Sequence, residues 1–131
     1  MVSHYNYRLK TNQTDLLHYN LPLNEWIKIT YERKEKPFFD NPLMFMPAKN
    51  WITDSDSNII VDDVFKLEEL CSSWDLIAQK LKRGGTEIRN ENKTQEYNAD
   101  TAIKLLNTES IETINSVFRE DFNLFGYRKI T

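Results

Sequence analysis

Few residues of this chain have the types and spacing that catalysis or metal binding requires. The two histidines, His4 and His18, have no acidic or cysteine partner at metal-ligand spacing, so no metal site is predicted. No histidine follows the single cysteine, Cys71, to act as its base. A buried structural cysteine is therefore favoured over a catalytic thiol.

Paired carboxylates occur at Asp62-Asp63 and at Glu68-Glu69. Adjacent residues of a strand point to opposite faces, so neither pair forms an acid/base dyad. We assign no catalytic residue from the sequence.

A basic set could bind phosphate or sulfate, and asparagines in the same segment add neutral donors. Its members are Lys80, Lys82, Arg83, Arg89 and Lys93, with Asn90 and Asn92. Glutamates at positions 87, 91 and 96 lower the net positive charge of this segment. Two interpretations stay open, an anion site and a solvated loop.

Composition limits the classes of partner. The chain has 131 residues, a net charge of -3 and a pI near 5.4, so it lacks the basic surface of nucleic-acid or anionic-membrane binders. Hydrophobic residues make up 40% and aromatic residues 12%, which indicates a folded chain. Without a leader-like start or a membrane-length apolar run, we expect a soluble, cytoplasmic protein.

Hydrophobic spacing predicts a mainly α-helical chain with one or two strands. We expect a strand at 61–67, where apolar and β-branched residues gather, and a long non-helical connection at 37–56, which holds three prolines. The best-marked helix covers 70–83, with Ser72 and Asp75 as a capping box and Gly84-Gly85 as its stop. Further helices are expected at 1–10, from near Pro22 to about residue 36, at 100–106 and at 108–121.

Three stretches carry a family resemblance: MVSHYNYRL at the start, VDDVFKLEEL at 61–70, and the segment from ENKT to the closing DFNLFGY. In this order they resemble the membrane-type and bacterial carbohydrate sulfotransferases, which transfer a sulfuryl group from 3'-phosphoadenosine-5'-phosphosulfate (PAPS) to a hydroxyl group. The resemblance implies the C-terminal portion of a P-loop-kinase-like α/β fold, as one partial domain over 1–131. The family's N-terminal phosphosulfate-binding loop has no counterpart here, and glycines occur only at positions 84, 85 and 126.

The resemblance also implies roles for particular residues. Ser3 matches the serine that binds the 3'-phosphate, and Asn92, Lys93 and Thr94 match a late loop that closes over PAPS. Glu68 matches a structural glutamate that orders loops near the site. The expected partners are PAPS as co-substrate, a carbohydrate or other hydroxyl acceptor, and a protein that supplies the missing half, without a metal.

Two departures bear on activity. Relatives often carry a His and a Gln in a His-Phe-x-Pro-Gln segment, whereas this chain has apolar residues there, Met44 and Ala48. Asn90 similarly stands where a histidine is common in relatives. The chain also offers neither the loop lysine nor an evident base, so we expect the isolated chain to be incomplete for catalysis. The alternative is a non-enzymatic helical protein-interaction module, a remnant of the same fold.

Overall fold

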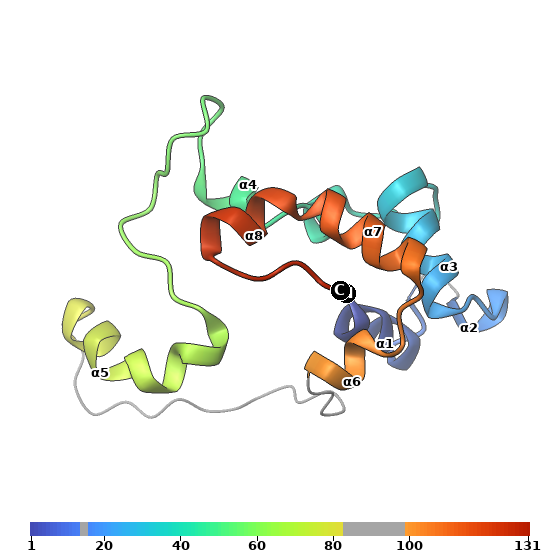
Figure 1. The fold of residues 1–131 in the computed structure, drawn as a ribbon, viewed down its shortest axis with the longest axis horizontal. Helices are drawn as coiled ribbons and strands as arrows, with labels where there is room; N and C mark the ends of the chain where they lie inside the picture. The colour runs from blue at the N-terminus through green and yellow to red at the C-terminus, as the bar shows by residue number, and fades with distance from the viewer. Residues whose placement is uncertain (14–15, 83–98) are drawn as a thin grey trace. The chain divides into compact units, whose positions relative to one another are not determined.

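The computed structural model describes residues 1–13, 16–82 and 99–131 (Figure 1). Contacts divide the chain into two compact units, Met1–Ile52 with Thr94–Thr131, and Thr53–Lys93. Across the described ranges the chain is mainly helical and has no β-strand, so the predicted helical character is confirmed. None of the described helices is long and apolar enough to cross a membrane.

The first unit holds most of the predicted helices. Its elements are α1 (Val2–Lys10), α2 (Leu16–Tyr19), α3 (Leu23–Ile27), the π-helix η2 (Lys28–Arg33), the 3-10 helix η3 (Pro42–Phe45), α4 (Lys49–Ile52), α6 (Ala99–Ile103), α7 (Thr108–Val117) and α8 (Arg119–Phe125). The connection 37–56 was predicted to be non-helical, and η3 and α4 are short helical turns within it. Asn41 caps η3, and Pro42 occupies its first turn.

The core of this unit forms around α3 and η2. Trp26 and Ile27 are fully buried and Tyr31 nearly so, because they lie on one face of the α3–η2 helix. The ring of Tyr31 packs edge-on against Phe45 with centroids 5.6 Å apart. Ile114 of α7 joins the same cluster. The predicted apolar stripe at 23–31 therefore supplies core residues of this unit.

The start of α7 is fixed by two asparagines. The side chain of Asn107 accepts a hydrogen bond from the backbone N–H of Ser110 at 2.8 Å, which makes Asn107 the N-cap. Asn24 bonds the same turn from α3: its Oδ1 accepts from Asn107 N–H at 3.0 Å and its Nδ2 donates to the Leu105 carbonyl at 3.1 Å. α3 and the α6–α7 turn are thereby held together.

The C-terminal segment folds back along α7 after α8 ends. Gly126, at φ +67°, takes the left-handed conformation that ends a helix without strain in glycine. The side chain of Asn115 then bonds both backbone groups of Ile130, at 2.8 and 3.0 Å. The chain end is thereby attached to α7.

The second unit contains η4 (Leu67–Glu69) and α5 (Leu70–Lys80). An isolated bridge joins Thr53 to Ile59 around the turn at 54–58, which Asp54 stabilises through the N–H groups of Asp56 and Asn58. None of residues 53–82 is buried. This unit is held by local turns and surface ion pairs, such as that between Lys80 and Asp63.

Two predictions for the second unit were wrong. No strand forms at 61–67, because a strand needs a neighbour to satisfy its backbone groups, and no described segment pairs with it. The capping box at Ser72 does not form either, since α5 begins at Leu70 with Glu69 as its N-cap. The Ser72 hydroxyl instead donates to the Glu69 carbonyl at 2.8 Å. The predicted Gly84-Gly85 stop lies outside the described residues.

Candidate functional site

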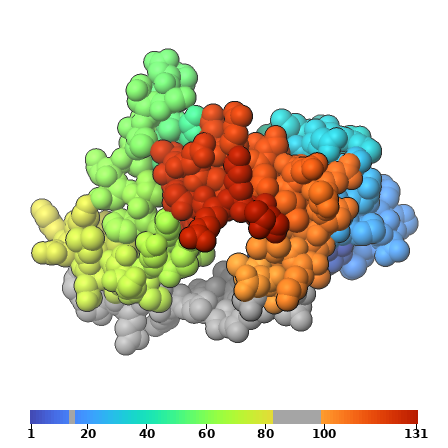
Figure 2. Space-filling view, viewed as in Figure 1, coloured from blue at the N-terminus to red at the C-terminus, as the bar shows by residue number. Residues whose placement is uncertain are grey.

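Ser3 lies in the first turn of α1 and lines a pocket of about 580 Å³. The other walls come from α6, α7, α8 and the C-terminal segment, all in the first unit. In the space-filling view the red C-terminal residues lie near the orange residues of α6 and α7 (Figure 2). We call this pocket the α1 pocket. Its volume lies within the range of small-molecule sites.

Arg128 lines the α1 pocket with Ser3, although the two residues are far apart in sequence. The bonds from Asn115 to Ile130 hold the segment that carries Arg128. Arg128 is exposed, and within the described ranges no carboxylate forms an ion pair with it. The pocket lining thus includes a hydroxyl group and a guanidinium group, both of which can bind phosphate oxygens, together with the Asp121 carboxylate.

The closing DFNLFGY stretch forms one wall of the α1 pocket. Phe122, Phe125 and Tyr127 line it, together with Phe118 and Ile114. The walls are therefore largely apolar, which suits a flat ring such as a nucleobase. Sequence reasoning noted the stretch as a resemblance and did not identify it as a pocket wall.

Asp121, the first residue of that stretch, has a structural role. Its two carboxylate oxygens accept hydrogen bonds from the backbone N–H groups of Ala48 at 2.7 Å and Lys49 at 2.9 Å. These N–H groups belong to the start of α4, so Asp121 caps that helix from a distance. Because both oxygens are engaged there, Asp121 is committed to holding α4 and α8 together.

Most of the other predicted site residues fall in the part of the chain that the structure does not describe. Asn92, Lys93 and Thr94 lie outside the described residues, as do Arg83 and Arg89 of the basic set. Glu68 is an exposed residue of η4 in the second unit. Lys80 of the basic set pairs with Asp63.

Cys71 and His4 differ from what the sequence suggested. Cys71 is exposed at the start of α5, so the expectation of a buried cysteine was wrong: in this unit no described side chain covers it. His4, interpreted as a surface residue, is half-buried and its ring stacks on Phe45 with centroids 5.1 Å apart. No group of histidine, cysteine or acidic side chains within the described ranges is arranged to hold a metal ion.

Sequence reasoning missed Arg8 of α1, the most buried charge among the residues that the structure describes. Its side chain is 2% exposed, donates from Nη2 to Asp40 Oδ1 at 2.7 Å and from Nε to His4 Nε2 at 2.9 Å, and lies 4.9 Å from the Phe45 ring centroid. Burial, and then the nearby Arg8 charge, lower the pKa of His4 to about 4. His4 is therefore neutral at neutral pH and able to accept from Arg8. The i, i+4 spacing of His4 and Arg8 was the available signal.

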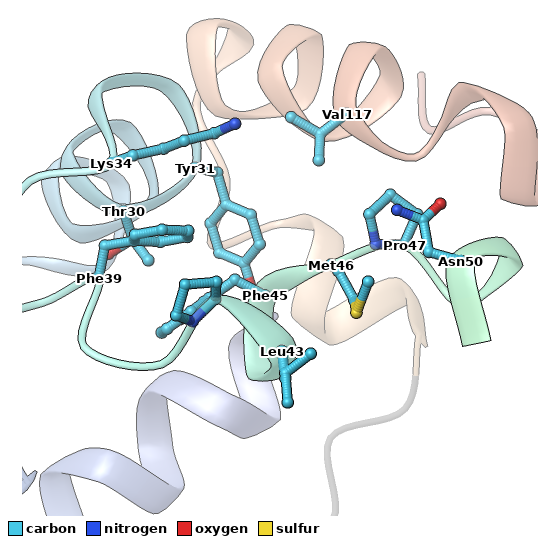
Figure 3. A pocket seen from close by; sticks show the side chains of 11 residues that line it. Thr30, Tyr31, Lys34, Phe39, Leu43, Phe45, Met46, Pro47, Asn50 and Val117 are labelled. Atoms are coloured by element: carbon cyan, nitrogen blue, oxygen red, sulfur yellow. The ribbon is translucent and has the colours of Figure 1, made fainter. Parts of the chain in front are cut away.

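A second pocket, of about 430 Å³, lies between η2 and residues 39–50 (Figure 3). It shares no lining residue with the α1 pocket. Lys34, Thr30 and Asn50 supply polar groups, and Phe39, Phe45 and several aliphatic residues supply the rest. We call this the η2 pocket.

Comparisons with protein-family models, curated proteins and solved structures yield no match for this chain. Functional inference consequently rests on the two pockets and on the residues that line them.

Proposed function

We propose that this chain contributes part of the nucleotide site of a PAPS-dependent sulfotransferase, with the α1 pocket holding the 3'-phosphoadenosine end of the co-substrate. The observation that supports this proposal is that Ser3 and Arg128 line one pocket with apolar walls. Ser3 is also the residue that the family resemblance matches to the 3'-phosphate-binding serine. A hydroxyl and a guanidinium beside aromatic walls fit a phosphorylated nucleoside.

In this proposal the fold is the C-terminal portion of a P-loop-kinase-like α/β domain, and the acceptor is a carbohydrate or another small hydroxyl compound. Sulfuryl transfer needs cations on the bridging phosphosulfate and a base on the acceptor hydroxyl. The chain contains no glycine-rich phosphate loop that would place a lysine on the bridging phosphosulfate. We therefore expect nucleotide binding by the isolated chain without sulfuryl transfer.

The test is calorimetric titration of 3'-phosphoadenosine-5'-phosphate and of AMP, which lacks the 3'-phosphate. We expect Arg128→Gln to weaken binding of the bisphosphate about tenfold, because one charge-assisted contact is lost. Ser3→Ala should weaken the bisphosphate more than AMP. Lys93→Ala tests the predicted closing loop and should also weaken binding.

Lys129→Gln is the matched control, since Lys129 is the exposed neighbour of Arg128 and does not line the pocket. It should bind the bisphosphate as the parent chain does. Absence of binding by a folded chain, or equal binding by all variants, would contradict the proposed site.

A second candidate function is supported by the surface of the second unit. Residues 53–82 include no buried side chain, and many of their large apolar residues are exposed: Ile59, Ile60, Val61, Val64, Leu67, Leu76 and Leu81. Large exposed apolar sets mark protein interaction sites. We propose that the chain is a non-enzymatic helical protein-interaction module and that another protein covers this exposed apolar set.

This candidate predicts that the chain binds hydrophobe-sensitive dyes and that Ile60→Lys together with Leu67→Lys removes most of this binding. Lys66→Gln, between the two positions, is the control and should leave dye binding unchanged. A monomer without dye affinity would argue against an interaction module.

A further inference from the structure

The η2 pocket combines apolar walls with a small set of polar groups. Phe39 and Phe45 form one wall, with ring centroids 5.2 Å apart and planes 33° apart. Pro42, Pro47 and Val117 add aliphatic surface. Figure 3 shows the Lys34 side chain extending along the pocket, with its amino end toward Val117. Such a site suits a flat apolar ring that carries one charge.

Lys34 supplies the cation of this pocket. It follows η2 with φ at 56°, a left-handed conformation that costs a non-glycine residue free energy and that clusters at functional sites. Within the described ranges no carboxylate forms an ion pair with it, and its side chain is exposed. The neighbouring cation Arg33 lies near Glu35 instead, at 3.9 Å. Lys34 is thus available to an anionic ligand.

Thr30 provides a second, independent observation. This residue lines the pocket and is fully buried, and its hydroxyl oxygen forms no hydrogen bond with a described group. A helical threonine normally bonds the carbonyl one turn earlier. A buried hydroxyl without a partner costs free energy, and a ligand atom that bonds it removes that cost.

We propose that the η2 pocket binds a small aromatic carboxylate, whose ring packs on Phe39 and Phe45 and whose carboxylate is bound by Lys34. A hydroxyl substituent on the ring would find Thr30 as a hydrogen-bond partner, whereas Asn50 lies on the opposite side of the pocket (Figure 3). A neutral sugar fits less well, because its many hydroxyl groups would meet mostly apolar walls. A single lysine also favours a monoanion over a phosphate group, which several donors usually bind.

Tyr31 lines the η2 pocket and is uncharged at neutral pH. Burial of Tyr31 raises its pKa to about 12, against a smaller opposing effect of Arg8, so the phenol stays protonated at neutral pH. This inference is independent of the nucleotide proposal, because the two pockets share no lining residue.

The probe is 4-hydroxybenzoate, titrated into the full chain by calorimetry, with phenol as the uncharged comparison. We expect 4-hydroxybenzoate to bind at least tenfold more tightly than phenol. Lys34→Gln should weaken the carboxylate about tenfold and leave phenol unchanged, since only the charge-assisted contact is lost. Lys36→Gln, an exposed lysine two positions away that does not line the pocket, should bind as the parent does.

Thr30→Val keeps the side-chain shape and removes the hydroxyl group. It should weaken 4-hydroxybenzoate several-fold while raising the melting temperature, because an unpartnered buried hydroxyl is lost. This pair of effects separates a weakened site from an unfolded one. Equal affinity for the carboxylate and phenol, or unchanged carboxylate binding by Lys34→Gln, would overturn the proposal.

Discussion

Arg8 and Asp40 form an ion pair of 2.7 Å between α1 and the segment before η3, with the arginine side chain 2% exposed and the aspartate 40% exposed. The pair joins positions 32 residues apart. Because the guanidinium also lies over Phe45 at 4.9 Å, the charge is enclosed by the aromatic core. α1 is therefore attached to the core through the buried guanidinium group of Arg8. Asp40 is the main anionic partner of that guanidinium group.

We expect Asp40→Asn to lower the free energy of unfolding by about 1–2 kcal/mol, because the buried guanidinium loses its counter-charge. This loss of free energy is smaller than that for a fully buried ion pair, because Asp40 is partly solvated. Urea denaturation followed by tryptophan fluorescence measures the change. Asp56→Asn makes the same substitution at an exposed turn residue and should leave stability unchanged. Equal stability of both variants would contradict the role of the Arg8–Asp40 pair.

His4 gives the protein a pH dependence above the range in which Asp40 titrates. The folded-state pKa of His4 is about 4, against 6.5 when exposed, so between these values the unfolded chain binds a proton that the folded chain does not. Stability should therefore fall as pH falls from 6.5 toward 4. Discounted for the partial exposure of His4, the loss from pH 7 to pH 5 is about 1 kcal/mol.

The variant His4→Gln keeps an acceptor for Arg8 and cannot titrate, so its stability should change less between pH 7 and pH 5. His18→Gln changes an exposed histidine of α2 and should keep the parent's pH dependence. The effect of Asp40 on stability can be distinguished from that of His4 by its pH range. Burial acts to raise the pKa of Asp40, but the hydrogen bond and the charge of Arg8 lower it. The contribution of Asp40 to stability is therefore lost only below about pH 4. Identical pH slopes for the parent and His4→Gln would contradict this account.

Asp121→Asn should lower the free energy of unfolding by about 1–2 kcal/mol. An amide has one acceptor oxygen, whereas Asp121 accepts from two backbone N–H groups through two oxygens. One of those N–H groups would then face the amide's own donors. Glu120→Gln is the control: Glu120 is the exposed neighbour that pairs with Lys49, and its loss should have a much smaller effect. Thermal denaturation compares the two variants.

The sequence by itself determined the local features of this protein. Trp26, Ile27 and Tyr31 lie at helical spacing, so the buried face of α3 and η2 could be predicted. The helix predicted at 70–83 begins at Leu70 as expected and ends earlier, at Lys80. Helix formation depends on neighbours a few positions away, which a sequence pattern records. Of the candidate site, Ser3 was identified through the resemblance alone.

Tertiary structure decided everything that depends on distant residues. The burial of Arg8 requires Asp40 and Phe45, and the capping of α4 requires Asp121, 72 positions further along the chain. Arg128 enters the α1 pocket because Asn115 bonds Ile130, which no local pattern predicts. The predicted strand at 61–67 failed for the same reason: β-structure needs a partner segment, and apolar spacing does not reveal whether one lies beside it.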